Sequence, residues 1–387
     1  MIDPYEIAAI PAIDTHMHRF HPSRAGEFGT VAGGYVAGPG QADHARQTML
    51  YRMVIETLRT HFQMPEDAPP AAVEAERCRR YAADPVAYSR DLLAGQNTAL
   101  YCVETGSPMG GPAYTAEEIR HFHQVLPAER CCDIIRIDRV AEELLKEDLP
   151  FSDFLCRFQE DLRREIDSHR TVGLKSCCAY NGGLDVRPTD REAAARGYER
   201  MRRGDPAGRK SFFDFLLLEG VEAAVERDLP IQIHTGAGGG TWLDFRTENP
   251  IHLIDFLKDE RVLDRCRIVL LHGGHPHEED TGYLVSQFAN VYTDFSGTFY
   301  LCTGKSVERM TALLERTPLN KVMYGSDGVG MPELTWFAHD RFRQQLVKLL
   351  DGLVAEGCMT RPRAQEAARM FLRDNALDCY KAVRGYL

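Results

Sequence analysis

Short apolar runs alternate with amphipathic segments along this chain of 387 residues. The amphipathic segments have the spacing of helices, as in 141–146, 212–226, 250–257 and 307–314. The apolar runs number eight and have the length of strands: 10–16, 98–103, 132–137, 172–178, 230–234, 267–272, 290–295 and 321–326. Strands that alternate with helices predict βαβ units and a parallel sheet, and eight such units predict an α/β fold of the (β/α)8 barrel type, a TIM barrel. A doubly wound open sheet is the alternative, but no G-x-G-x-x-G motif follows the first run.

The interval between the first two runs is much longer than the others. We interpret residues 20–97 as a helical insertion after the first strand, above or beside the C-terminal mouth of the barrel. Helical spacing recurs three times within it, at 45–58, 71–80 and 84–94. The Gly-rich stretch 30–40 predicts a loop, and residues 332–383 predict closing helices. Because no linker or repeat interrupts the chain, residues 1–387 are expected to form one domain.

Composition narrows the classes of partner. Acidic residues outnumber basic ones by 57 to 46, and the net charge of −11 argues against nucleic acid and against an anionic membrane surface. No apolar run approaches the roughly 20 residues that span a bilayer, and no secretion signal is visible at the N-terminus. The eleven cysteines include no C-x-x-C pair, as expected for reduced thiols. We therefore expect a cytoplasmic protein that acts on a small molecule, either alone or as a homo-oligomer.

Residues able to bind a metal close five of the apolar runs. His16 and His18 end the first run, and their imidazoles project together because residues two apart on a strand face the same side. The ends of the fourth, fifth, sixth and eighth runs carry Lys175, His234, His272 and Asp327. In a (β/α)8 barrel these ends meet at one mouth, where the active sites of the fold lie. The six side chains therefore predict a metal centre.

The chemistry of these ligands suits a divalent metal, with Zn²⁺ favoured over Mn²⁺ or Fe²⁺. Such an ion lowers the pKa of bound water from about 15.7 to about 7. Asp327 is placed to contact the metal and to carry the proton of the attacking water to the leaving group. Lys175 has three interpretations: a carbamate that bridges two ions, a plain lysine paired with Asp327 or substrate, or a member of a structural ion pair. His272 is correspondingly a ligand of a second ion or a residue that faces the substrate.

The motifs around these residues resemble those of the amidohydrolase superfamily. Its D-x-H-x-H opening corresponds to Asp14–His18, and the lysine, two histidines and aspartate fall on the expected strands. Within the superfamily, the chain is most similar to the group that includes the N-terminal half of fungal and plant glutamine-synthetase fusion proteins. The similar stretches cover nearly the whole chain: 173–180, 232–236, 249–253, 271–276, 282–284, 324–327 and 374–380.

The resemblance implies metal-dependent hydrolysis of a C–N bond, in an amide of a small polar or amino-acid-derived substrate. Some relatives are instead non-oxidative decarboxylases with a single metal, which is the alternative activity. A binding role without catalysis is a third interpretation and requires vestigial ligands. One departure concerns recognition, because relatives commonly carry an arginine where this chain has Asn181, directly after Tyr180. If that arginine binds a substrate carboxylate in relatives, the substrate here differs.

Several other residues stand near the expected mouth. Asp14 is expected to orient a ligand histidine through the ring nitrogen that does not bind metal. Glu104 and Arg136 each either contact substrate or join an internal ion pair, and Cys177 has no paired histidine that would make it a nucleophile. The Gly-rich stretch 235–240 lacks the Lys-Ser/Thr of a phosphate loop and instead predicts close approach of the backbone to the site. The candidate substrate contacts are Arg136, Tyr180 and His275.

Overall fold

The computed structural model describes residues 2–20, 28–32, 42–106, 113–205, 207–239, 243–298 and 303–387. Eight parallel strands form one sheet, and each strand pairs with the next along the chain. They are β1 (Ala12–His18), β2 (Thr98–Glu104), β3 (Cys131–Arg136), β4 (Thr171–Ser176), β5 (Ile231–Ile233), β6 (Ile268–Leu270), β7 (Val291–Asp294) and β8 (Val322–Met323). Each strand overlaps one of the eight apolar runs, in the same order, so the predicted (β/α)8 barrel is confirmed.

Backbone hydrogen bonds between β1 and the segment after β8 close the barrel. Asp327 N donates to His16 O over 2.8 Å, and His18 N donates to Gly328 O over 2.8 Å. Closure of the barrel therefore places three of the predicted ligands beside one another.

The barrel interior is filled by apolar side chains that alternate along the strands. Ile13, Leu100, Ile134, Val269 and Met323 are all fully buried there. The C-terminal segment packs into the same cluster through Tyr380, whose hydroxyl accepts a hydrogen bond from Gln232 Nε2 at 2.8 Å. The interior is thus a packed core, and the chemistry is confined to the strand ends.

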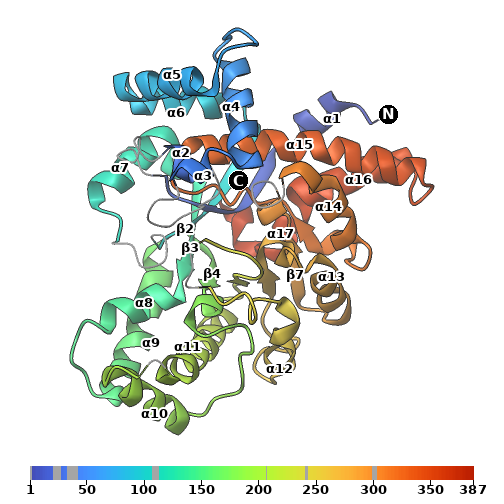
Figure 1. The fold of residues 1–387 in the computed structure, drawn as a ribbon. Coiled ribbons are helices and arrows are strands. Elements are labelled where there is room, and N and C mark those ends of the chain that lie inside the picture. The colour runs from blue at the N-terminus through green and yellow to red at the C-terminus, as the bar shows by residue number, and fades with distance from the viewer. Residues whose placement is uncertain are drawn as a thin grey trace.

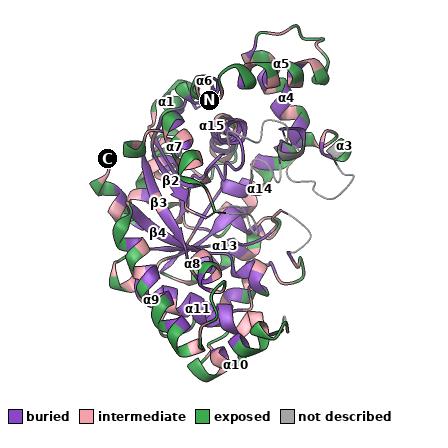
Figure 2. Cartoon of the chain, turned by 90° about the vertical axis from the view of Figure 1, so that its left-hand side faces the viewer, coloured by how far each residue is buried: buried purple, intermediate pink, exposed green. Residues whose placement is uncertain are grey.

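Helices surround this barrel (Figure 1). The insertion between β1 and β2 contains α2 (Phe28–Val31), α3 (Ala42–Ala45), α4 (Met49–His61), α5 (Pro70–Ala83) and α6 (Pro85–Ala94). The others are α1 (Pro4–Ala9), α7 (Ala116–Val125), α8 (Ile137–Leu144), α9 (Phe151–Ser168), α10 (Arg191–Arg202), α11 (Ala207–Glu226), α12 (Ile254–Leu257), α13 (Glu278–Gln287), α14 (Ser306–Leu314), α15 (Pro332–Ala355), α16 (Arg361–Arg369) and α17 (Asn375–Cys379). Figure 2 shows the buried strands at the centre and exposed outer faces on the helices. No described helix is both long enough and apolar enough to cross a membrane.

Local sequence signals explain where several helices begin. Thr48 accepts a hydrogen bond from the backbone at the start of α4, and Asp84 does the same for α6, which opens with Pro85. Thr115 and Glu118 form a reciprocal capping box at α7. Of the loop predicted at 30–40, residues 30–31 end α2 and residues 33–40 lie outside the described part of the chain.

A buried ion pair connects the insertion to the segment that follows β8. Arg77 on α5 donates from Nε to Glu333 Oε1 over 2.5 Å, and both side chains are fully buried. The Tyr88 hydroxyl donates to the same oxygen over 2.8 Å. Figure 1 shows α4, α5 and α6 together at one end of the molecule, next to α15. Since Glu333 stands in the first turn of α15, shortly after Asp327, the insertion supports this side of the mouth.

Candidate metal centre

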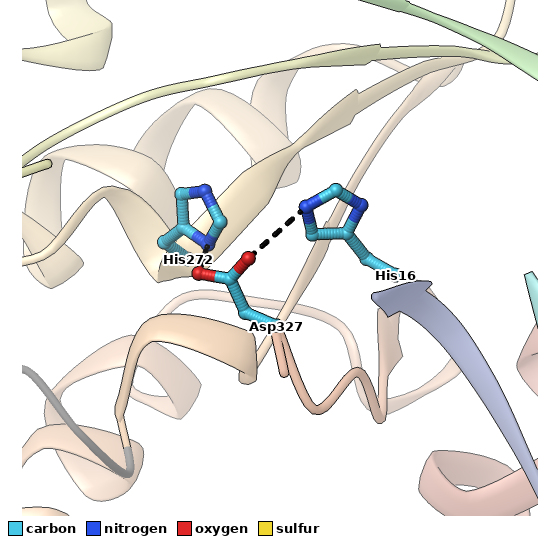
Figure 3. A group of neighbouring side chains, drawn as sticks. All are labelled: His16, His272 and Asp327. Carbon is cyan, nitrogen blue, oxygen red and sulfur yellow. Dashed lines mark ion pairs between the residues drawn. The ribbon is translucent and has the colours of Figure 1, made fainter. Parts of the chain in front are cut away.

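His16, His18 and Asp327 converge at the mouth of the barrel. The Nε2 atoms of the two histidines lie 3.3 and 3.4 Å from one oxygen, Asp327 Oδ1. Figure 3 shows the Asp327 carboxylate between His16 and His272, and its Oδ2 lies 3.4 Å from His272 Nδ1. His16, His272 and Asp327 are buried, and one ligand atom from each lies within 4.8 Å of the ligand atoms of the other two. The arrangement therefore brings imidazole and carboxylate donors to one point.

Both the spacing and the charge of this cluster fit a divalent cation. Two ligand atoms on a tetrahedral ion with bonds of about 2.0–2.1 Å stand about 3.3–3.4 Å apart. The two histidines have this spacing from Asp327 Oδ1. Burial and Lys175 act to lower the pKa of His18, but hydrogen bonds to Asp327 and Glu104 raise it above its ordinary value. The carboxylates of Asp327 and Glu104 thus supply negative charge where the donors meet, and the residues present fit the metal that the resemblance implies.

Asp327 is ionised and held in a strained conformation. Its φ of 48° lies in the left-handed region, which costs a residue other than glycine about 1–2 kcal/mol. Burial would raise the pKa of this carboxyl, but His272 and hydrogen bonds from His16 and His18 hold it well below its usual range. At neutral pH, Asp327 is therefore a carboxylate that can bind a cation or accept a proton.

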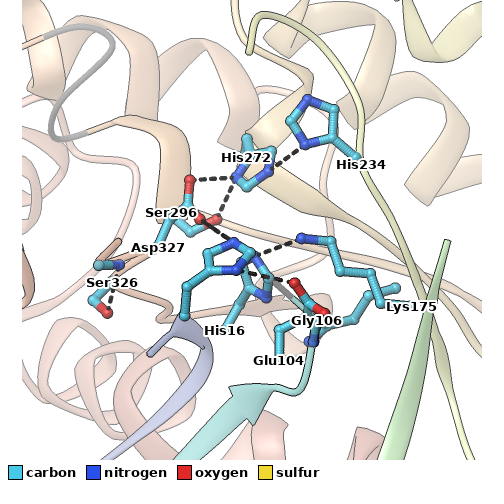
Figure 4. Close-up of polar contacts among 12 residues, drawn as sticks. His16, Glu104, Gly106, Lys175, His234, His272, Ser296, Ser326 and Asp327 are labelled. Carbon is cyan, nitrogen blue, oxygen red and sulfur yellow. Dashed lines mark hydrogen bonds and ion pairs between the residues drawn. The ribbon is translucent and has the colours of Figure 1, made fainter. Parts of the chain in front are cut away.

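Lys175 reaches the same cluster from β4. Its Nζ lies 3.2 Å from His16 Nε2, and Figure 4 shows the side chain directed at that ring. Burial and, after it, the Lys175 charge lower the pKa of His16 to about 3. His16 is consequently neutral, which is the state that a metal ligand requires.

His234 is linked to the cluster through His272. Its Nδ1 lies 3.0 Å from His272 Nε2, and its Nε2 lies 3.3 Å from the Tyr180 hydroxyl. A Cβ added to Gly238 would stand 2.9 Å from His234 Nε2 and would overlap the Tyr180 hydroxyl. The described part of the Gly-rich stretch after β5 therefore approaches the site as closely as predicted, and a larger residue at position 238 would displace Tyr180.

Two residues that the sequence did not single out hold His272 in place. Its backbone N–H donates to Asp294 Oδ1 over 2.7 Å, and its Nδ1 lies 2.9 Å from Ser296 Oγ. Ser296 Oγ in turn donates to Asp294 Oδ1 over 2.8 Å. Asp294 closes the seventh apolar run just as Asp327 closes the eighth, and this was the signal available in the sequence.

Glu104 contacts His18 on the side of the ring that faces away from Asp327. Its Oε2 lies 3.0 Å from His18 Nδ1 and 3.6 Å from Arg136 Nη1. Burial would raise the pKa of Glu104, but Arg136 and His18 hold it well below its usual range. Glu104 and Arg136 therefore form an internal ion pair, which was one of the two alternatives considered for them. Burial raises the pKa of Cys177 to about 12, so this thiol stays protonated.

The prediction that Asp14 orients the ring of a ligand histidine is wrong. Asp14 Oδ1 instead accepts hydrogen bonds from the backbone N–H groups of Ser326, at 2.9 Å, and His16, at 3.3 Å. The pairing of β1 with β2 shifts register after Asp14, and the carboxyl group meets backbone rather than an imidazole. Asp14 thus fixes the chain on either side of the site instead of a ring.

Two further candidates have partners within the protein. His275 Nδ1 lies 2.6 Å from Glu278 Oε1. Asn181 is buried, donates to Asp138 Oδ1 over 2.5 Å and accepts from Arg209 Nη2 over 2.6 Å. Asn181 therefore joins a network beside the mouth, and Tyr180 before it contacts His234.

Comparison with known proteins identifies the family. The family model described as amidohydrolase matches residues 134–382, more than half of the chain. The protein fluG of Emericella nidulans is 28% identical over 295 residues, which make up 68% of this chain and 34% of fluG. The chain thus spans about a third of the length of this relative.

Solved structures share the fold. A protein from Lactobacillus casei described as a metal-dependent hydrolase aligns with a TM-score of 0.81 and 20% identity over 99% of both chains. Glucuronate isomerase from Caulobacter crescentus aligns with a TM-score of 0.67 and 14% identity, over 98% of this chain and 92% of that one. With a family model that matches more than half of its length and a barrel of the same kind, the chain belongs to the amidohydrolase family.

Proposed function

We propose that this chain is a metal-dependent hydrolase that cleaves a C–N bond in an amide of a small polar or amino-acid-derived substrate. The observation that carries the proposal is the convergence of both histidines of the H-x-H pair on Asp327 Oδ1. The barrel alone does not select this chemistry, because the isomerase from Caulobacter crescentus has the same fold. The activity is therefore argued from the site.

The first ion would be held by His16, His18 and Asp327, with Zn²⁺ favoured by the donor set. A second ion would be held by His234 and His272 if Lys175 is carboxylated and bridges the two. When bound, the metal polarises the substrate carbonyl and makes water nucleophilic at neutral pH. If Lys175 is a plain lysine, one ion would be held by His16, His18, His234 and Asp327, with His272 then free to contact substrate.

The protein's own groups would manage the protons and the orientation. Asp327 is ionised and would take a proton from water at a carboxylate oxygen and pass it to the leaving nitrogen. Burial raises the pKa of Tyr180, so its hydroxyl keeps its proton and would donate a hydrogen bond to a polar substrate group. Glu104 keeps the ring of His18 turned toward the cluster. Arg136, bound to Glu104, would act on this arrangement rather than on the substrate.

The test combines metal analysis with a substrate panel. Purified protein is assayed against N-acyl amino acids and small amides, with products identified by mass spectrometry in water enriched in oxygen-18. We expect label in the carboxylate product, loss of turnover after chelation, and recovery with Zn²⁺ or Mn²⁺. Asp327→Asn keeps the size of the side chain and should abolish turnover, whereas Asp255→Asn, at an exposed position on α12, should not.

Two results would contradict the proposal. Full turnover by protein shown to be free of metal would exclude the metal-dependent mechanism. Release of CO2 from an acid substrate without uptake of labelled oxygen would instead establish a decarboxylase.

A further inference from the structure

A chain of hydrogen bonds runs from β7 through the site to Tyr180. It begins at Asp294, whose Oδ1 lies 2.8 Å from Ser296 Oγ, and continues from that hydroxyl to His272 Nδ1 at 2.9 Å. His272 Nε2 then faces His234 Nδ1 at 3.0 Å, and His234 Nε2 faces the Tyr180 hydroxyl at 3.3 Å. Figure 4 shows the central links of this chain, from Ser296 through His272 to His234.

The direction of the first links follows from the number of protons available. Asp294 Oδ1 already accepts from the backbone N–H groups of His272, at 2.7 Å, and Ser296, at 3.3 Å. Because this oxygen is an acceptor, the single hydroxyl proton of Ser296 is donated to it. The oxygen of Ser296 must then accept from the ring, so His272 Nδ1 carries a proton. Asp327 Oδ2, at 3.4 Å from the same nitrogen, is a second acceptor and agrees with this assignment.

The remaining links follow in turn. A neutral imidazole has one protonated nitrogen, so His272 Nε2 presents a lone pair. Among the described residues, His234 Nδ1–H is the donor that faces it, across 3.0 Å, which leaves a lone pair on His234 Nε2. The Tyr180 hydroxyl, with one proton to give, donates to that nitrogen. Each donor in the chain therefore meets an acceptor.

We infer that Ser296 is a positioning residue: anchored by Asp294, it fixes the Nδ1–H tautomer of His272 and so presents the Nε2 lone pair to the site. This inference rests on the proposed function for its effect on turnover, but the tautomer itself does not depend on it. Hydrogen bonds of this kind to the second nitrogen of a site histidine set which nitrogen can bind a metal or a substrate proton. With Nδ1 protonated, Nε2 is the nitrogen of His272 that is left to bind an ion in the two-ion site or to accept a proton from substrate in the one-ion site.

The experiment reads the tautomer directly. Long-range proton–nitrogen NMR spectra of metal-free protein labelled with ¹⁵N-histidine distinguish a protonated Nδ1 from a protonated Nε2, and the His272 signals are assigned with His272→Gln. We expect the Nδ1–H pattern in the natural protein. Ser296→Ala should mix the two tautomers and weaken Zn²⁺ binding or turnover about 10- to 100-fold. Ser296→Thr retains the hydroxyl and should restore both the Nδ1–H pattern and the Zn²⁺ binding or turnover of the natural protein.

A matched control separates positioning from loss of a buried hydroxyl. Ser89 on α6 is also buried, and its hydroxyl donates to Pro85 O over 2.6 Å, so Ser89→Ala removes a comparable bond away from the site. This variant should leave the His272 pattern and Zn²⁺ affinity unchanged. An Nε2–H pattern in the natural protein overturns the inference without any variant. An Nδ1–H pattern and Zn²⁺ affinity that survive Ser296→Ala overturn it as well, even if metal-dependent hydrolysis is established.

Discussion

Replacing Arg77 by Met leaves the Glu333 carboxylate buried without its guanidinium partner. The pair is fully buried, with an Nε to Oε1 distance of 2.5 Å, and the guanidinium also lies 4.4 Å from the ring centre of Tyr81 and 4.8 Å from that of Phe28. Removal of one partner from a buried ion pair costs about 3–5 kcal/mol because the other charge stays uncompensated. Methionine retains apolar contact with the rings, and the Tyr88 hydroxyl still reaches Glu333, so we expect a loss near the lower limit, about 3 kcal/mol.

The double variant Arg77→Met with Glu333→Gln tests this origin of the loss. Neither charge of this pair is then buried, and the glutamine oxygen can still accept a hydrogen bond from Tyr88. The loss of stability in the double variant should therefore be smaller than the sum of the two single losses, by about 2 kcal/mol or more. The free energy of unfolding is measured in urea by circular dichroism and by tryptophan fluorescence, to which Trp336, buried in α15 near Glu333, contributes. Arg79→Met, in an exposed pair on the same helix, is the control and should change stability little. A loss below about 1 kcal/mol for Arg77→Met, or strict additivity, would refute the reasoning.

Three further predictions concern the site. Burial lowers the pKa of His272 to about 4 from an ordinary 6.5, so in metal-free protein its stabilising contribution is complete above pH 6.5 and is lost as the pH falls toward 4. His272→Asn should therefore flatten the fall of unfolding free energy between those pH values by up to about 1.4 kcal/mol per pH unit, and an equal slope in chelated samples of both proteins would show that His272 is not kept neutral. Gly238→Ala should lower kcat/KM about tenfold or more by displacing Tyr180, while Gly352→Ala, where a Cβ meets nothing within 4 Å, leaves it unchanged; equal kinetics would contradict this. We expect about two ions per chain, with Lys175→Ala lowering metal content by about half and small carboxylic acids restoring part of it; about one ion per natural chain under excess metal and bicarbonate would exclude the bridging carbamate.

The barrel and the cluster of ligand-type residues could be predicted because each depends on local sequence. An apolar run that ends in histidine or aspartate identifies both a strand and its catalytic end. Since all strand ends of a parallel barrel share one mouth, His16 and Asp327 could be placed together although they lie at opposite ends of the sequence. Neither inference needed the exact register of the strands.

What could not be predicted depends on register and on turns. The alternation of β1 suggested that Asp14 faces a ligand ring, but a register shift along β1 directs its carboxyl group to backbone N–H groups. Glu104 takes the place behind a histidine ring because β2 ends level with His18, a pairing that no local pattern records. Ser296 acts through a turn that follows β7, and a single serine in a loop carries no periodic signal.

The early ends of β6 and β8 follow from the same geometry. The sequence predicts runs at 267–272 and 321–326, but the strands stop at Leu270 and Met323. His272 then takes a φ of 66° and Asp327 a φ of 48°, and each costs about 1–2 kcal/mol. If β6 and β8 were longer, His272 and Asp327 would lie further along their separate strands. The turns instead bring His272 Nδ1 to 3.4 Å from Asp327 Oδ2.

The strain at these two positions is offset by the bonds that the turned backbone makes. The N–H of His272 reaches the Asp294 carboxyl group at 2.7 Å, and the N–H of Asp327 reaches His16 O at 2.8 Å. A buried hydrogen bond contributes about 0.5–1.5 kcal/mol net, and more when the acceptor is charged, which is the size of the conformational cost. The bond from Asp327 also closes the barrel against β1. Closure of the fold and convergence of the proposed ligands are therefore achieved by the same backbone groups, so a change that relaxes either turn should loosen the barrel and the site together.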